Sequence, residues 1–149
     1  MKFWDASAVI PLCVDEAQTQ TVRDIAKKDE GFVVWWGSIV ESYSAFARLR
    51  RDRSLSSNDE AKGLGVLSEL ANTWTEIEPS DDIREITRRL LQNYPLRTAD
   101  SLQLAAALVW CDKTPKGHHF VCLDMRLREA ALREGFTVLP SKTIERTAR

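Results

Sequence analysis

Residues 120–131 read Phe120-Val-Cys-Leu-Asp-Met-Arg-Leu-Arg-Glu-Ala-Ala131. An apolar run of four residues ends at Asp124, and the residues that follow have the composition of a helix. The same order occurs near the start of the chain, where the apolar run Lys2-Phe-Trp4 is followed by Asp5 and a helical segment. A strand that leads directly into a helix is the repeating unit of α/β proteins with parallel sheets.

Strand and helix patterns alternate along the rest of the chain. We predict strands at Lys2–Trp4, Phe32–Trp35, Phe120–Leu123 and Thr137–Leu139, with a minor strand at Thr75–Glu78. Predicted helices run from Ser7 to about Glu16, over Thr19–Lys28, Ser38–Arg53 and Ser57–Ala71, from the cap Ser80 to Asn93, and from Thr98 through Trp110. The last of these is apolar on every side, which predicts a central, buried helix. These patterns indicate an α/β fold with a mainly parallel central sheet of about four to five strands flanked by helices, in a single domain that spans residues 1–149.

The composition excludes several classes of protein. The 149 residues carry 21 Lys and Arg against 22 Asp and Glu, a formal charge of −1, which is not expected of a disordered polyelectrolyte or of a protein that binds nucleic acid by net charge alone. The three cysteines are odd in number and lie in apolar stretches, which favours a reducing compartment. The most apolar stretch, 104–111, is shorter than the ~20 residues of a membrane span. We therefore expect a cytoplasmic protein with no membrane partner.

Four acids lie where strands end or helices begin. Asp5 and Asp124 each close an apolar strand, and Glu41 and Asp100 lie in the first turns of two predicted helices. In an open parallel sheet, the carboxyl ends of the strands and the N-termini of the following helices share one edge, where ligands of such folds bind. The four carboxyl groups are therefore expected to converge.

Each acid also has an explanation that requires no chemistry, because Asp is a preferred N-cap and acids are favoured at helix N-termini. Glu41 completes the pattern Ser38-x-x-Glu41, which is typical of a capping box. Asp100 is harder to explain in this way, since Thr98 already supplies a cap and the helix that follows is apolar all round. Asp100 is therefore expected to have a partner.

If the four acids converge, a cation must offset their repulsion. At an effective dielectric of about 20 and a separation of ~5 Å, each like-charged pair costs roughly 3 kcal/mol. Mg²⁺ and Mn²⁺ prefer carboxylate and water oxygens, and such an ion activates a bound water and polarises a phosphate oxygen. The pattern favours phosphodiester hydrolysis with Mg²⁺ (or Mn²⁺) as the cofactor.

Four segments resemble the PIN-domain ribonucleases, and specifically the VapC-type toxins of toxin–antitoxin pairs. They are Asp5-Ala-Ser7, Ser38-Ile-Val-Glu-Ser-Tyr43, Leu96-Arg-Thr-Ala-Asp-Ser-Leu-Gln-Leu-Ala-Ala106 and residues 120–131, which run in family order over essentially the whole chain. The resemblance implies a PIN-like three-layer fold. It implies that the metal ligands are Asp5, Glu41, Asp100 and Asp124, and that the Ser7 hydroxyl helps to hold the site water or the metal. It also implies a homodimer and an antitoxin segment lying across the acids. Arg126 stands where some PIN nucleases carry a further acid or amide.

Cations on one predicted helix suggest contacts with RNA. At 3.6 residues per turn, Arg48 lies nearly above Glu41, and Arg51 continues the stripe. This spacing predicts a track for RNA phosphates, with a solvated helix face as an equally simple explanation. Arg97, just before the helix of Asp100, suits a contact with an acid or a phosphate, or plain surface exposure.

The pair Trp35-Trp36 lies beside Gly37 at the edge of the expected site. One indole is suited to stacking on an unpaired base. Core packing or a dimer contact is the better explanation for at least one of the two. The sequence leaves these alternatives open.

The leading hypothesis is a metal-dependent endoribonuclease that hydrolyses phosphodiester bonds of structured RNA. It would be the toxin of a type II toxin–antitoxin module, neutralised by a cognate antitoxin. A first alternative is a PIN-like module that binds RNA or a partner without cleavage, against which the presence of all four acids argues. A second is a phosphotransfer domain, either a receiver or a phosphatase-like domain. The phosphatase would require a second Asp at the position of Ser7, and the receiver an acidic pair near the N-terminus.

Overall fold

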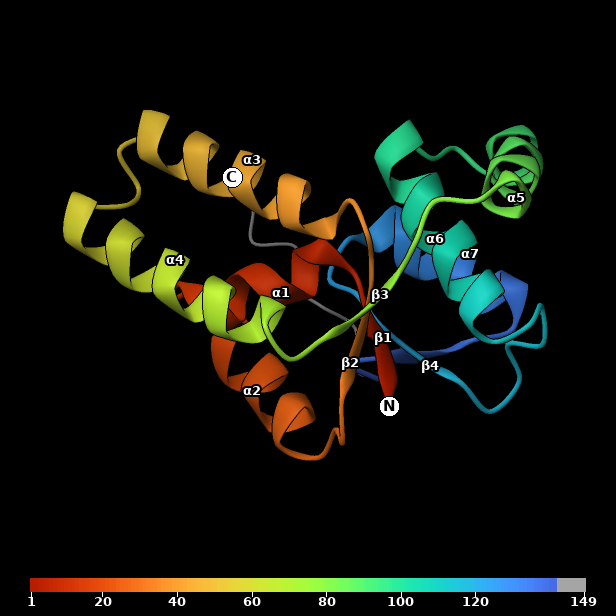
Figure 1. Cartoon of the computed structure of the whole chain (residues 1–149), viewed down its shortest axis with the longest axis horizontal. Helices are drawn as coiled ribbons and strands as arrows, with labels where there is room; N and C mark the ends of the chain where they lie inside the picture. Colours follow the sequence, from red (N-terminus) through yellow and green to blue (C-terminus); the bar gives the residue numbers. More distant parts are fainter. Residues whose placement is uncertain (142–149) are drawn as a thin grey trace.

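The computed structural model describes residues 1–141 and has a central sheet between two groups of helices (Figure 1). The sheet contains β1 (Lys2–Trp4), β2 (Phe32–Trp35), β3 (Thr75–Ile77), β4 (His119–Val121) and β5 (Thr137–Leu139). Their order is β3-β2-β1-β4-β5, and every neighbouring pair is parallel. The sheet of the described residues thus confirms the predicted α/β class and the parallel arrangement of its strands.

Two helical layers cover the two faces of the sheet, which gives the three layers that the resemblance implies. One layer consists of α1 (Ala6–Cys13), α2 (Thr19–Lys27), α3 (Ser38–Arg51) and α4 (Ser57–Ala71), and the other of α5 (Asp81–Asn93), α6 (Thr98–Trp110) and α7 (Met125–Glu134) (Figure 1). Successive side chains of a strand point to opposite faces. Phe3 accordingly packs in the core beneath α5–α7, whereas Trp4 packs in the core beneath α1–α4.

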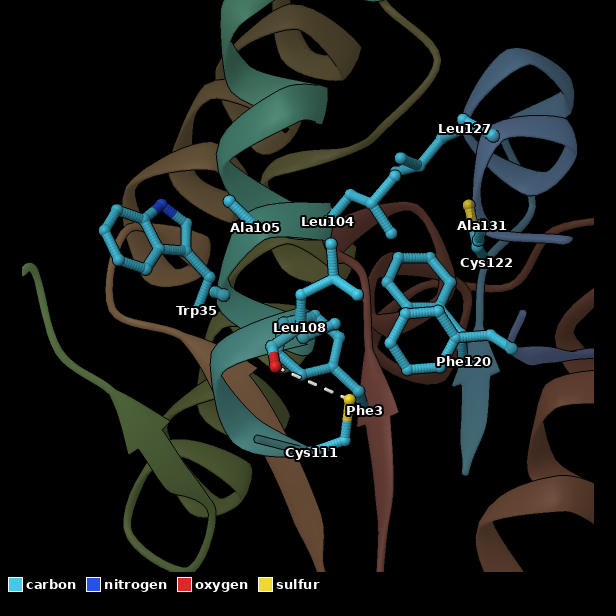
Figure 2. Packing of buried hydrophobic residues seen from close by; sticks show 14 of the residues in the cluster. Phe3, Trp35, Leu104, Ala105, Leu108, Cys111, Phe120, Cys122, Leu127 and Ala131 are labelled. Carbon is cyan, nitrogen blue, oxygen red and sulfur yellow. Dashed lines mark hydrogen bonds between the residues drawn. The ribbon is translucent and has the colours of Figure 1, made fainter. Parts of the chain in front are cut away.

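Helix α6 is central and buried, as its apolar sequence predicts. Side chains of α6 such as Leu104 and Leu108 pack against Phe3 and Phe120, whose stacked rings lie 5.4 Å apart (Figure 2). Each fully buried Leu or Phe contributes about 1.5–3 kcal/mol relative to exposure. This packing holds the N-terminal end of α6, which carries Asp100, over the carboxyl edge of the sheet.

Several predicted boundaries are wrong by a few residues. Helix α1 begins at Ala6 and ends at Cys13 rather than near Glu16, because Val14 has extended backbone angles. Helix α2 ends at Lys27 rather than Lys28, β3 ends at Ile77 rather than Glu78, and α3 ends at Arg51 rather than Arg53, whose φ is 56°. Strand β4 spans His119–Val121 rather than Phe120–Leu123, since its pairing with β1 places Val121 opposite Trp4 at the end of that strand.

Three predicted helix caps are also wrong, because the backbone starts each helix one residue earlier than the side-chain pattern indicates. The pattern Ser57-x-x-Glu60 predicts a capping box with Ser57 as the cap, but Ser56 caps α4 instead, with its Oγ accepting from the backbone N–H of Asp59. The N-caps of α3 and α6 are Gly37 and Arg97, so that Ser38 and Thr98 are the first helical residues instead of caps. The predicted cap of α5 is confirmed, since the Ser80 Oγ accepts from the N–H of Ile83 at 3.2 Å.

Two further findings concern the class of protein. No helix within residues 1–141 is long and apolar enough to cross a membrane. Cys13, Cys111 and Cys122 are free thiols. The cytoplasmic location stays a prediction.

Candidate active site

The four acids occupy adjoining positions at the carboxyl edge of the sheet. Asp5 directly follows β1 and Asp124 precedes α7 after the neighbouring strand β4, while Glu41 and Asp100 lie in the first turns of α3 and α6. Their charges reach one another: Asp5 and Asp100 both act on Glu41, and Asp124 acts on Asp100. The structure therefore brings the four carboxyl groups into one electrostatic neighbourhood, as their positions in the sequence predict.

Asp5 is buried and is held by neutral donors. Its Oδ2 accepts from the backbone N–H of Ser7 at 3.1 Å, from the Ser7 hydroxyl in a short hydrogen bond, and from the thiol of Cys122 at 3.6 Å. The Ser7 Oγ in turn accepts from the N–H of Leu123 at 3.0 Å and so ties the end of β1 to the loop after β4. Burial raises the pKa of Asp5 to about 6, against the effect of the Ser7 hydrogen bonds.

Glu41 is linked to α6 by a glutamine that the sequence reading missed. The fully buried Gln103 donates from Nε2 to Ser38 Oγ at 2.9 Å and to Glu41 Oε2 at 3.1 Å. The expected capping box is therefore wrong: neither Ser38 nor Glu41 caps α3, because both side chains are engaged by Gln103. Burial raises the pKa of Glu41 to about 7, together with the charges of Asp5 and Asp100 and against the Gln103 hydrogen bond.

Gln103 had one visible signal in the sequence, since it is the polar residue inside the otherwise apolar run Leu102–Leu108. Its Oε1 is buried and has no hydrogen-bond partner within residues 1–141. A buried amide oxygen without a partner is uncommon in native proteins and calls for an explanation. Here, beside Glu41, it adds an amide oxygen that accepts no hydrogen bond and lies close to the acids.

Asp100 and Asp124 differ in how the fold uses them. Asp124 is the N-cap of α7, with its Oδ1 accepting from the N–H of Leu127 at 2.9 Å, so its structural explanation is correct. Asp100 is half-buried; burial, followed by the charge of Asp124, raises its pKa, while nearby Arg97 and Arg126 oppose that rise. The partners that Asp100 was expected to need are thus two arginines close enough to affect its titration.

The three cations predicted to contact RNA are exposed. Arg48 and Arg51 lie on the exposed face of α3, and Arg97 precedes α6. Within residues 1–141 none of the three forms an ion pair, whereas the intervening Arg50 lies 3.6 Å from Glu60 of α4. The arginines are therefore available to a ligand, and the phosphate track stays a prediction.

The acids fit a hard divalent cation by their chemistry. Asp5 and Glu41 provide carboxylate oxygens that only neutral groups bond, and their raised pKa values show that the negative charge is not offset. Within residues 1–141, however, no three Asp, Glu, His or Cys side chains form a ready-made metal site. Mg²⁺ commonly retains several waters and uses one or two protein carboxylates. The side chains therefore suit a hydrated ion better than a closed cage of ligands.

The two tryptophans at the end of β2 and just after it have different environments. Trp35 is 7% exposed and belongs to the core, whereas Trp36 is 50% exposed, with the two rings edge to face at 6.4 Å. Gly37 makes this arrangement possible, since a Cβ at that position would lie 2.5 Å from the indole nitrogen of Trp35. Core packing is thus correct for Trp35, and Trp36 alone is free to stack on a ligand from the surface.

No protein-family model matches the sequence, and neither does any curated protein. Solved structures do match. A chain of a toxin–antitoxin complex from Klebsiella pneumoniae superposes with a TM-score of 0.65 at 14% identity, over 97% of this chain and 100% of that one. VapC20 from Mycobacterium tuberculosis, described as a sarcin-ricin loop cleaving toxin, gives 0.62 at 14% identity, over 87% of this chain and 95% of that one. FitAcB from Neisseria gonorrhoeae superposes with a TM-score of 0.62 at 13% identity, over 95% of this chain and 98% of that one. The chain therefore has the PIN fold of VapC-type toxins, as its sequence predicts.

Proposed function

We propose that the protein is a Mg²⁺- or Mn²⁺-dependent endoribonuclease, the toxin of a type II toxin–antitoxin module, and that it hydrolyses phosphodiester bonds of structured RNA. The observation that carries this proposal is the group of acids at the carboxyl edge of the sheet. Burial and mutual repulsion raise the pKa values of three of them, and no described cation bonds to Asp5 or Glu41. The shared fold of a toxin described as cleaving the sarcin-ricin loop supports the same reaction class.

The acids Asp5, Glu41, Asp100 and Asp124 would hold the ion. When bound, it supplies activation of a water and polarisation of a phosphate oxygen. With a pKa of about 7, Glu41 carries a proton in part of the metal-free molecules at neutral pH and must release it to become a ligand. Metal affinity is therefore expected to rise with pH.

Two residues position the ligands. Ser7 holds the carboxylate of Asp5 from both its backbone N–H and its hydroxyl. Gln103 holds Glu41 against α6. Such partners fix the orientation of metal ligands, and their loss commonly costs about 10–100-fold in metal affinity or activity. In this proposal Ser7 acts through Asp5, which is a more specific role than the water or metal contact that the resemblance implies.

A partner surface adjoins the acids. Trp36, Val40 and Tyr43 are 50%, 62% and 54% exposed at the start of α3, although all three are large and apolar. Clusters of exposed apolar side chains commonly mark interaction sites. This supports an antitoxin that covers the acids, and a homodimer, as partners of a cytoplasmic toxin.

Cleavage of a defined RNA tests the function directly. A synthetic hairpin with the sarcin-ricin loop sequence, and total RNA in parallel, would be incubated with the protein in Mg²⁺, in Mn²⁺ and in excess EDTA. We expect cleavage only with a divalent ion, and loss of cleavage in Asp100→Asn. Asp59→Asn is the matched control, because Asp59 is also a first-turn acid but lies in α4, away from the site. Binding of RNA without cleavage under every condition would instead identify a non-cleaving module.

A further inference from the structure

A pocket of about 460 Å³ opens between the end of β2, the start of α5 and the first turns of α6. Its apolar wall includes Trp35, Ile83 and Leu102, and its polar side chains include Asp81 and Arg84. Pockets of this size and mixed lining are typical of sites for small molecules or for single groups of a larger ligand.

The Trp35 wall of the pocket and Asp5 lie at the same end of two neighbouring strands. Strands β1 and β2 pair with Phe3 opposite Val33, so the same register continued by two residues sets Trp35 level with Asp5. A ligand whose reacting group lies at the acids can therefore place a neighbouring group in the pocket.

Trp35 offers the pocket an unused hydrogen-bond donor. Two other buried indoles have acceptors, since Trp4 Nε1 donates to Asp29 at 2.8 Å and Trp74 Nε1 donates to Glu76 at 3.0 Å. Trp35 as a residue is 7% exposed, but its N–H is not one of the fully buried polar atoms that lack a partner, and it meets no acceptor within residues 1–141. Because Trp35 lines the pocket and its indole N–H is accessible and unpaired, this N–H is available to donate to a ligand that supplies an acceptor.

We propose that this pocket binds an unpaired nucleobase of the RNA, next to the phosphate that is cleaved. The inference rests on the proposed function and deepens it. A base has two apolar faces, which suit Ile83 and Leu102, and carries a carbonyl or ring nitrogen that can accept from Trp35. Arg84 provides a cation for the adjoining phosphate; its pair with Asp81, at 3.8 Å between two highly exposed side chains, is easily exchanged.

The indole N–H signals of the five tryptophans provide a direct test by two-dimensional ¹H–¹⁵N NMR. The Trp35 signal would be assigned by its loss in Trp35→Phe. The metal-free protein in EDTA would then be titrated with the four nucleoside 5′-monophosphates and, separately, with inorganic phosphate. We expect a saturable shift of the Trp35 signal with at least one nucleotide and none with phosphate, while the hydrogen-bonded indoles of Trp4 and Trp74 do not respond.

A second variant tests the pocket itself. Leu102→Phe fills the space next to Trp35 and should remove most of the nucleotide-dependent shift. Leu132→Phe adds the same group on an exposed position of α7 and should leave the shift unchanged. Both comparisons require only that the variants keep the dispersed spectrum of a folded protein.

Three results would overturn the proposal: no shift with any nucleotide, an equal shift with phosphate alone, or a shift with N-acetyl-leucinamide but not with nucleotides. The last would identify a pocket for a peptide side chain. None of these results depends on metal or on cleavage. Loss of the base pocket in an enzyme that still cuts RNA is therefore distinguishable from failure of the endoribonuclease function.

Discussion

The fold shifts the pKa values of its shielded acids in opposite directions, with Glu134 on one side of the comparison and Asp5 and Glu41 on the other. The carboxylate of Glu134 accepts from Arg89 at 2.6 and 3.2 Å and from the hydroxyl of Tyr94 at 2.5 Å. Burial opposes ionisation of Glu134, but these bonds outweigh it and lower the pKa. At the carboxyl edge of the sheet, burial dominates and raises the pKa values of Asp5 and Glu41, because their hydrogen-bond donors are neutral.

The difference separates a structural acid from acids kept for a ligand. Glu134 joins α7 to Arg89 of α5 and satisfies its charge inside the fold. The carboxyl groups of Asp5 and Glu41 form no ion pair within residues 1–141 and accept hydrogen bonds only from neutral donors. Strongly perturbed carboxyl groups gathered at a ligand-binding edge are candidates for function, since their cost to the fold needs a compensating role.

The largest effect is expected on cleavage. Asp5→Asn should lower metal-dependent RNA cleavage by at least about 100-fold, more than the loss of a partner that only orients a ligand. Glu134→Gln removes a partly shielded acid that lies outside the site and should leave the cleavage rate nearly unchanged. Initial rates on one hairpin RNA, for variants confirmed to be folded, make the comparison. Equal losses in both variants would mean that cleavage reports stability alone.

The next effect concerns stability and pH in the absence of metal. The pKa of Asp5 is raised to about 6 from an ordinary 3.8, so the folded state favours the protonated acid. The free energy of unfolding that this preference contributes is fully present below about pH 4 and is lost as the pH rises through 6. Asn does not ionise, so the Asp5→Asn variant does not lose this stability as the pH rises. The variant should therefore match the wild type near pH 4 and exceed it by about 2–3 kcal/mol near pH 7.5.

Urea unfolding across this pH range, in EDTA, measures the difference. Mn²⁺ added near pH 7.5 should stabilise the wild type and narrow the gap, because only the wild type retains the Asp5 carboxylate as a ligand. A gap that does not change with pH would show that the Asp5 carboxyl is not destabilised by its surroundings.

Glu134→Gln should show the opposite behaviour. Loss of the charged hydrogen bonds from Arg89 and Tyr94 is expected to lower the free energy of unfolding by about 1–2 kcal/mol, after allowance for the exposure of Arg89. Glu129→Gln is the matched control, since its pair with Arg133 is an exposed i,i+4 contact worth about 0.3–0.5 kcal/mol. The denaturant midpoints of Glu134→Gln and Glu129→Gln at neutral pH measure the difference. Equal midpoints would show that Glu134 does not stabilise the fold more than an exposed acid does.

The smallest effect is expected from the unpaired arginines. Changing Arg48 and Arg51 together to Ala should weaken RNA binding and reduce the slope of log affinity against log salt by up to about 1.4, at roughly 0.7 per single-strand phosphate contact. Arg50→Ala is the control, because Arg50 already pairs with Glu60. Fluorescence anisotropy of labelled RNA at several salt concentrations measures both. Unchanged slopes would show that the stripe on α3 is only a solvated face.

Local patterns in the sequence were sufficient for the order of the elements and for the positions of the four acids. Alternating apolar runs and helical segments depend on residues that are neighbours in the chain, and an acid that ends a parallel strand necessarily lies at its carboxyl edge. Asp5 and Asp124 were therefore placed correctly. Their capping roles were also foreseeable, since a cap involves contacts over only two or three residues.

Tertiary structure alone decided the contacts between distant segments. Gln103 reaches Glu41 across 62 residues of sequence, and no periodicity of α6 indicates that partner. Likewise, Trp35 and Trp36 are identical in type and adjacent, and only the fold buries the ring of Trp35, the last residue of β2, and exposes that of Trp36 in the turn that follows. The local distribution of charge also depends on tertiary structure. The total of −1 belongs to the sequence, whereas the uncompensated acids at one edge and the compensated Glu134 at another depend on which side chains the packing brings within hydrogen-bond distance.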